Sequence, residues 1–141
     1  MKPNHYIAYW KWADYLGRDQ QNAYHSKSKV VERMERGEVL WLFTRNPTSQ
    51  AIHMVQRIVV AEKGRTASQE PRIYWVQGKG KLRNVEASGT HSDWRAIIGA
   101  AFTVNGTSLS AGSASELAQK FMQPRQISPD FVAPLETEWK K

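Results

Sequence analysis

One stretch of the chain, at residues 38–44, constrains the fold more than any other. Its sequence, EVLWLFT, holds five consecutive apolar residues, Val39 to Phe43. A run of this length bounded by turn residues is typical of a strand that is buried on both faces. We therefore expect a sheet that carries packed side chains on each face. Trp41, in the middle of the run, is expected to be a core residue.

Several other segments have the character of strands. Residues 5–10, 52–61 and 72–77 are rich in β-branched and aromatic residues and are flanked by residues that favour turns. Residues 82–87 are a candidate antiparallel return after a turn at 78–81. Residues 93–102 fit a strand or a helix equally well. Residues 103–115 are small, polar and Gly-containing, which is typical of a flexible loop.

The helix signals are short. Residues 11–21 are polar and fit a loop or a short helix. Hydroxyl residues at 26 and 28 precede apolar residues at 30, 31 and 34, which predicts a helix over 29–36 that ends before Gly37. The spacing of Ser113 and Glu116 predicts a capping box and a helix to about residue 122.

A last helix is expected at the C-terminal end of the sequence. Ser128 and Pro129 have the types preferred at a helix N-cap and first position. The buried face would carry residues 131, 132 and 135, and Pro134 shortens or kinks the helix. The 141 residues contain no repeat and no interdomain linker, so we expect one domain over 1–141. Its class is α+β, with one curled mixed sheet of five or six strands flanked by short helices.

Catalysis finds little support in the sequence. There is no Cys, which excludes a disulfide scaffold, a Cys-ligated zinc site and a Cys nucleophile. The four His lack metal-binding spacing, and Gly78 and Gly80 lack the rest of a nucleotide-binding glycine fingerprint. We therefore expect no catalytic residue, no metal, no cofactor and no enzyme activity. No apolar run is long enough for a membrane span or a leader, so we expect a cytoplasmic protein with no membrane partner.

Charge and Trp content point to nucleic acid. Residues 1–85 hold 15 Lys and Arg against 7 Asp and Glu, whereas residues 86–141 hold 5 against 6. The chain also has six Trp. A basic half that is rich in Trp is suited to contact phosphates and to stack on flat rings. The alternative is a basic protein whose Trp residues fill the core.

Two segments carry this pattern most clearly. Residues 72–84 hold four positive charges and no acid, which would neutralise phosphates or form a solvated hairpin face. In the first strand, Trp10 and Trp12 would point the same way if the strand continued to residue 12. Two indoles on one side can sandwich a planar base, can surround a methylated cation as an aromatic cage does, or can pack in a core.

The order of these signals resembles the EVE domain of the PUA-like superfamily, whose relatives include the YTH and ASCH domains. Residues 5–10 are similar to the opening Tyr- and Trp-rich strand, and residues 34–43 to a turn followed by a strand. Residues 52–60 fit the family's third element. Residues 117–130 (LAQKFMQPRQISPD) resemble the closing segment, although Ala118 stands where the family has Gly.

The resemblance implies a PUA-like mixed β pseudo-barrel with an aromatic pocket at one end. Such a pocket receives a modified base, methylated or hydroxymethylated, by base flipping from DNA, or a base displayed in RNA. Because such domains are often joined to nucleases in restriction–modification systems, a nuclease domain on the same or a partner chain is the implied partner. Aromatic walls would replace the stacking that an extruded base loses.

The resemblance assigns site residues by matching positions of this sequence to those of the family. The candidate ligand-binding residues are Trp10, Trp12, Tyr24, Ser26, Asn46, Trp75 and Trp94. The candidate contacts to the nucleic-acid backbone are Lys79, Lys81, Arg83 and Arg125. The leading hypothesis is DNA binding through recognition of a modified base, without catalysis. The alternatives are an RNA-binding PUA- or ASCH-like domain, a small nuclease or hydrolase, and a protein–protein scaffold.

Overall fold

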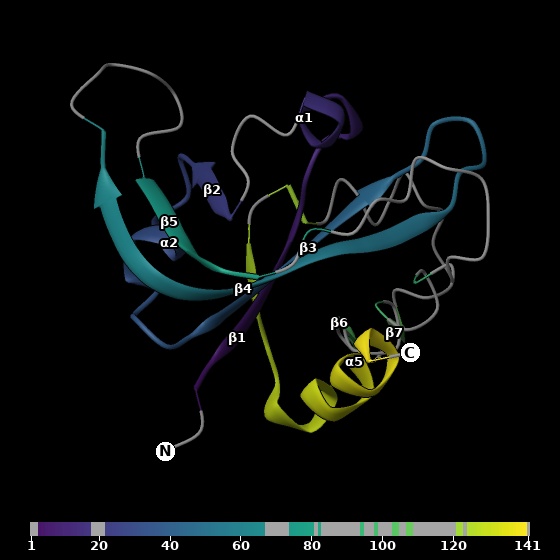
Figure 1. The fold of residues 1–141 in the computed structure, drawn as a ribbon. Coiled ribbons are helices and arrows are strands. Elements are labelled where there is room, and N and C mark those ends of the chain that lie inside the picture. The colour runs from purple at the N-terminus through teal and green to yellow at the C-terminus, as the bar shows by residue number, and fades with distance from the viewer. Residues whose placement is uncertain are drawn as a thin grey trace.

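A computed structural model describes residues 3–17, 22–66, 74–80, 82, 94, 98, 103–104, 107–108, 121–122 and 124–140. They form a six-stranded mixed sheet with short helices, an α+β arrangement (Figure 1). The strands of this sheet are β1 (His5–Tyr9), β2 (Ala23–Ser26), β3 (Val39–Arg45), β4 (Ile52–Arg65), β5 (Tyr74–Lys79) and β8 (Arg125–Ile127). The helices are α1 (Trp12–Gly17), α2 (Lys29–Arg33), the 3-10 turn η2 (Pro129–Phe131) and α5 (Val132–Trp139).

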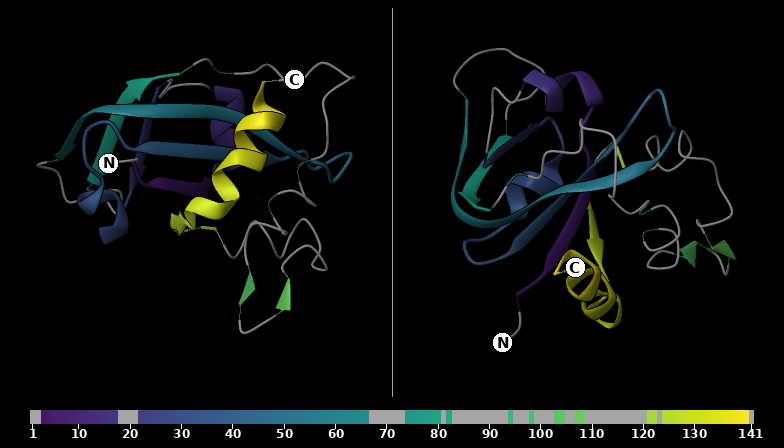
Figure 2. Two further views of the ribbon diagram at one scale, coloured as in Figure 1. Left: turned by 90° about the horizontal axis from the view of Figure 1, so that it is seen from below. Right: turned by 45° about the vertical axis from the view of Figure 1, so that its right-hand side comes forward.

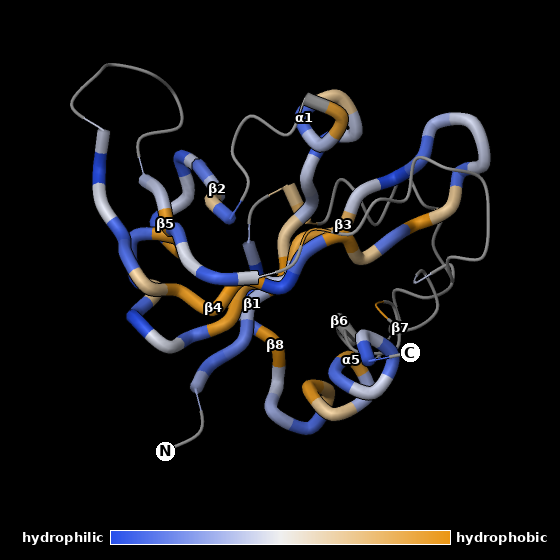
Figure 3. The backbone as a smooth tube through the Cα atoms, viewed as in Figure 1, coloured by the Kyte–Doolittle hydropathy of each residue, from blue (hydrophilic) through white to orange (hydrophobic). Residues whose placement is uncertain are grey.

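The sheet is ordered β2-β5-β4-β3-β1-β8. All neighbours are antiparallel except β1 and β3, which run parallel with Ile7 opposite Trp41. The connection between these two parallel strands contains α1, β2 and α2. Figure 3 shows apolar residues gathered where β1, β3 and β4 meet in the middle of the sheet.

The apolar run at 39–43 forms β3, and its residues alternate between two cores. Leu40 and Leu42 belong to a cluster on the face covered by α2, which we call the inner face. Val39, Trp41 and Phe43 belong to a cluster on the face covered by α5, which we call the outer face. Trp41 is fully buried, as the sequence predicts. A continuous apolar strand is thus explained by cover on both sides.

Helix α5 crosses the outer face of the sheet, as both views in Figure 2 show. Leu135 is fully buried there, and the ring of Trp139 meets that of Trp41 edge-on at 5.9 Å. Arg57 of β4 and Glu136 of α5 add a salt bridge, with Nε 2.6 Å from Oε1. The helix is therefore held by both apolar burial and charge.

The sheet curls around its inner face because β4 is bent. Register shifts interrupt its pairing with β3 between Leu42 and Phe43, and its pairing with β5 between Val60 and Glu62. Such bulges bend a strand and increase its local twist. In Figure 1, β4 sweeps round so that β5 and β2 arch back toward α2.

Most predicted elements are confirmed within the described residues. The predicted strands at 5–10, 38–44, 52–61 and 72–77 correspond to β1, β3, β4 and β5. The Ser28 Oγ caps α2 by accepting a hydrogen bond from the backbone N–H of Val30 at 3.2 Å. The last helix begins as the turn η2 and continues as the short α5 with Pro134 inside it.

Four expectations need correction. Helix α2 stops at Arg33, three residues early, because Met34 is already extended, at φ −63° and ψ 140°. Strands β2 and β8 were missed because four- and three-residue strands leave almost no periodic pattern. The expected loop at 103–115 contains a two-stranded sheet, β6 (Thr103–Val104) with β7 (Thr107–Ser108).

Some predictions fall outside the described residues. These are the return strand at 82–87 apart from Leu82, the segment 93–102 apart from Trp94 and Ile98, and the helix expected after Ser113 apart from its end, where Phe121 and Met122 form a turn and a bend and are not helical. Among the helices in the described residues, none combines the length and the apolar character that crossing a membrane requires.

Candidate ligand-binding site

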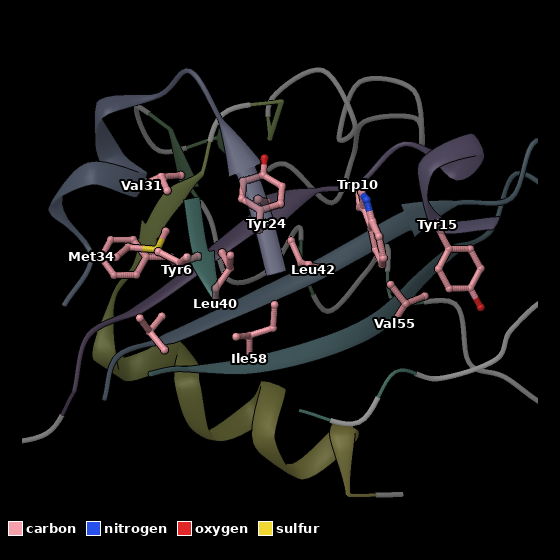
Figure 4. Close-up of a cluster of buried hydrophobic side chains, with 13 residues drawn as sticks. Tyr6, Trp10, Tyr15, Tyr24, Val31, Met34, Leu40, Leu42, Val55 and Ile58 are labelled. Carbon is pink, nitrogen blue, oxygen red and sulfur yellow. The ribbon is translucent and has the colours of Figure 1, made fainter. Parts of the chain in front are cut away.

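Four aromatic side chains belong to the inner core or border it: Trp10 follows β1, Trp12 and Tyr15 are on α1, and Tyr24 is on β2. We call Trp10, Trp12, Tyr15 and Tyr24 the aromatic cluster. The ring of Tyr15, on α1, lies 5.8 Å from that of Trp10 and 5.4 Å from that of Trp12. Tyr24 reaches the same core from β2 (Figure 4). Helix α1 thus packs both early Trp residues against one Tyr.

Burial differs within the aromatic cluster. Trp10 is 6% exposed, Tyr24 7% and Tyr15 0%, so these three are core residues. Trp12 is half-buried at the margin of the same core. A ligand could reach the face of Trp10 only by displacing a neighbouring side chain. The indole of Trp12 is the more accessible stacking surface of the two.

A row of buried polar side chains lies on the same face of the sheet. We call Thr44, His53 and Gln56 the buried polar row. Thr44 pairs with His53 across β3 and β4, and Leu42, which is in the inner core, pairs with Gln56. Because side chains alternate along β3, Thr44 shares the face of Leu42. The backbone N–H of Trp10 donates to the carbonyl oxygen of Phe43 at 2.8 Å, which brings Trp10 beside this row.

Two oxygen atoms of the row have no hydrogen-bond partner within the described part of the chain. They are Oγ1 of Thr44 and Oε1 of Gln56, and both side chains are 0% exposed. Leaving a buried acceptor unpaired costs about 1–3 kcal/mol. Buried polar atoms in folded proteins usually bond to protein, water or ligand. An aromatic core with two unpaired oxygens is therefore a candidate place for a polar guest.

The surface near Gln56 is formed by Asn22 and the end of β5. Nε2 of Gln56 donates to Oδ1 of Asn22 at 2.7 Å and to the carbonyl oxygen of Gly80 at 3.2 Å. Asn22 and Gly80 are both half-exposed. Gln56 therefore lies directly beneath groups that reach the surface. Lys79, which precedes Gly80, is exposed and pairs with Val59 of β4.

The glycines at 78 and 80 allow this close approach. A Cβ at Gly80 would overlap the carbonyl oxygen of Arg57, and one at Gly78 would overlap that of Val59. The sequence singled out this Gly-Lys-Gly stretch as a turn between basic residues. In the structure, Gly78 and Lys79 are instead the last residues of β5 and pair with Val60 and Val59 of β4, and the carbonyl oxygen of Gly80 anchors Gln56.

The other end of the inner face is also polar. The hydroxyl of Tyr6 donates to Oε1 of Glu38 at 3.4 Å, and the same oxygen accepts from the backbone N–H of Glu35 at 2.7 Å. Burial, and then the Glu38 carboxylate, raise the pKa of Tyr6 above its usual value. The phenol of Tyr6 at this end is therefore neutral, and its hydroxyl is hydrogen-bonded to Glu38.

The remaining ligand-binding candidates from the sequence have local roles. Oγ of Ser26 accepts from the backbone N–H of Ser28 at 3.0 Å, and Oδ1 of Asn46 accepts from those of Thr48 and Ser49. The ring of Trp75 lies over Gly64, where a Cβ would meet it at 2.5 Å. Trp94 is 3% exposed and packs in the outer core near Trp139. The structure does not bring these four side chains into the aromatic cluster.

Two further expectations, about the elements on which Trp12 and Tyr24 lie, are wrong. The first strand ends at Tyr9, and Trp12 begins α1, so the strand does not carry both indoles as alternation would require. Tyr24 lies on β2 and not on a loop leading to α2.

The predicted backbone-contact residues are not brought together either. Lys79 is on β5, whereas Arg125 is on β8, at the other end of the strand order. The guanidinium of Arg125 lies 5.8 Å from the ring centroid of Phe121. Lys81 and Arg83 are outside the described residues. Among the described candidates, Lys79 is one residue from Gly80, whose carbonyl oxygen bonds Gln56, but it pairs with Val59 and its side chain points away from the inner face.

Sequence reasoning missed Asn22 and the buried polar row. The signal was present: His53, Gln56 and Arg57 interrupt an otherwise apolar stretch at 52–61, and Thr44 ends a run that is buried on both faces. A polar residue in such a strand must be buried, which requires a partner. Within the described ranges, no group of three or more His, Asp or Glu could hold a metal ion.

Comparisons with known proteins add no further assignment. No family model matches the sequence, and a search of the curated proteins finds no similar one.

Proposed function

We propose that this protein is a non-catalytic nucleic-acid-binding module that recognises a modified base at the aromatic cluster. The resemblance to EVE domains suggested this function, and the observation that carries it is a specific combination of groups. Stacking surfaces and unpaired hydrogen-bonding atoms occur side by side on the inner face of the sheet. A base needs both, because its ring stacks and its edge forms hydrogen bonds.

The PUA-like pseudo-barrel is part of the same proposal. A curled mixed sheet with α2 and α5 on opposite faces is compatible with it. DNA carrying a methylated or hydroxymethylated base is the proposed ligand, and Lys79 is the proposed contact to a flanking phosphate. A nuclease on the same or a partner chain would act on the marked site.

In this proposal, the aromatic side chains do not form an open cage before a base binds. Trp12, which is half-buried, offers the stacking surface, while Tyr15 packs against it and Trp10 packs against Tyr15. Trp10 and Tyr24 become walls only when a base enters and side chains move apart. Opening a core costs free energy, and the unpaired oxygens offset part of that cost by gaining partners.

The test is a binding panel of oligonucleotides that differ at one base. The panel contains 5-methylcytosine, 5-hydroxymethylcytosine, N6-methyladenine and their unmodified parents, in DNA and in RNA. We expect tighter binding to one modified base, and binding that weakens with salt. Trp12→Ala should reduce affinity about 5- to 100-fold, as removal of a stacking partner does. The matched control is Trp139→Ala, a half-buried Trp on the outer face, for which affinity should be retained in the folded protein.

Three results would contradict the proposal, each in a different way. Equal affinity for modified and unmodified bases would remove the claim of specificity. Tight binding to structured RNA, without preference for a modification, would favour a general RNA-binding domain. Metal-dependent cleavage of plasmid DNA would favour a nuclease.

A further inference from the structure

The side-chain amide of Gln56 has a fixed orientation. The carbonyl oxygen of Gly80 can only accept a hydrogen bond, so the Gln56 atom 3.2 Å from it must be the amide nitrogen. The second amide hydrogen goes to Oδ1 of Asn22 at 2.7 Å. Both donors of the amide are therefore committed within the protein, and Oε1 is the atom left over.

Oε1 of Gln56 can act only as an acceptor. An amide oxygen has two lone pairs and no hydrogen, so its partner must bring an N–H or O–H group. Within the described residues it has no partner, although the side chain is 0% exposed. Thr44 and His53 of the buried polar row do not donate to it, and Leu42, which pairs with Gln56, and Val55, which precedes it, are aliphatic.

We propose that Gln56 is the specificity-determining residue of the site, with its Oε1 accepting a hydrogen bond from an N–H group on the ligand. This inference rests on the proposed function and deepens it, because it selects among bases by their donors. A base with an exocyclic amino group presents such a donor on its edge. A base with a carbonyl oxygen at that position would set two acceptors against each other.

Asn22 has a positioning role in this proposal. Its backbone φ of 65° lies in the left-handed region, and its carbonyl oxygen accepts from the backbone N–H of Gly78 at 2.8 Å. The side chain is thereby directed from the start of β2 toward Gln56. Asn22 fixes the amide and touches no ligand itself.

The test uses the full chain and pairs of single-stranded oligonucleotides that differ in one donor. The pairs are 5-methylcytosine against N4,N4,5-trimethylcytosine, and N6-methyladenine against N6,N6-dimethyladenine, and the second member of each pair keeps the ring but lacks the amino N–H. For the pair that contains the preferred base, we expect the wild-type protein to favour the member with the amino N–H by about 5- to 100-fold. Gln56→Met, which keeps a long unbranched side chain, should lose that preference.

Controls separate loss of recognition from loss of folding. Gln126→Met makes the same chemical change at an exposed position on β8 and should keep the wild-type preference. If Gln56→Met does not fold, Asn22→Gly serves instead. Glycine tolerates the positive φ, and the variant frees one amide hydrogen while leaving Gln56 in place. We expect it to weaken the preference without abolishing it.

The outcomes distinguish a failure of the role proposed for Gln56 from a failure of the proposed function. A preference for the amino N–H that is as strong as in the wild type in every folded variant, Gln56→Met and Asn22→Gly included, would overturn the role of Gln56 and leave the proposed function standing. A preferred base that binds equally well without its amino N–H would do the same. No preference for any modified base would overturn the proposed function, and the role of Gln56 with it.

Discussion

The indole Nε1 of Trp41 donates a hydrogen bond to Nδ1 of His5, 3.0 Å away, from one parallel strand to the next. The two rings are also roughly stacked, with centroids 6.2 Å apart. Nδ1 can accept this bond only when it carries no proton. Burial, and then the nearby Arg57 guanidinium, lower the pKa of His5 from its usual 6.5, and Glu136 opposes them.

This arrangement predicts how stability depends on pH. Above pH 6.5 His5 is neutral in the folded and the unfolded chain, so its contribution is fully present. As the pH falls through 6.5, the unfolded chain takes up a proton that the folded chain resists. The free energy of unfolding should therefore fall between pH 7 and pH 5. Urea denaturation across this range measures it.

His5→Gln provides the control for this prediction. The Gln side chain offers a neutral acceptor to Trp41 and does not titrate, so the slope of stability against pH should become shallower. The two proteins differ at this position alone, so the difference in slope is attributed to His5. An unchanged slope would show that His5 does not carry the effect.

The Arg57–Glu136 pair should contribute measurably to the attachment of α5. It is bidentate, with Nε to Oε1 at 2.6 Å and Nη2 to Oε2 at 3.0 Å. The Arg57 guanidinium also lies 5.3 Å from the ring centroid of Trp41. The pair is partly solvated, so we expect Glu136→Gln to cost about 1 kcal/mol, and less at high salt. Glu62→Gln, at an exposed position on β4, is the matched control and should change the free energy of unfolding little.

The fold was largely predictable where the pattern was long. The run at 39–43 required cover on both faces, and α2 and α5 supply it. β2 was missed because Tyr24 and Ser26 alternate over only four residues, too few to stand out from a capping segment.

The candidate site was less predictable, because it depends on pairing between distant segments. The bond between Gln56 and Asn22 spans 34 residues, and no local pattern reports it.

Two glycines should respond to substitution for different reasons. Gly80→Ala places a methyl group against the carbonyl oxygen of Arg57, so we expect a loss of about 1–3 kcal/mol from overpacking. Gly37 has open space around it but a φ of 88°. Asn tolerates that region, so Gly37→Asn should cost less than Gly80→Asn. Thermal unfolding of the variants tests this order, and equal losses at both positions would contradict it.

Lys79 should contribute a phosphate contact whose signature is its salt dependence. It is exposed at the end of β5, one residue from the Gly80 carbonyl that anchors Gln56. A cation that displaces a counterion from duplex DNA contributes about 0.9 to the slope of log affinity against log salt. Lys79→Gln should lower the slope by about that amount while keeping the preference for the modified base, because phosphate contacts carry no base identity. Lys140→Gln, at an exposed residue after α5, is the control and should leave the slope unchanged. If both variants keep the wild-type slope, the nucleic-acid backbone does not pass over the end of β5.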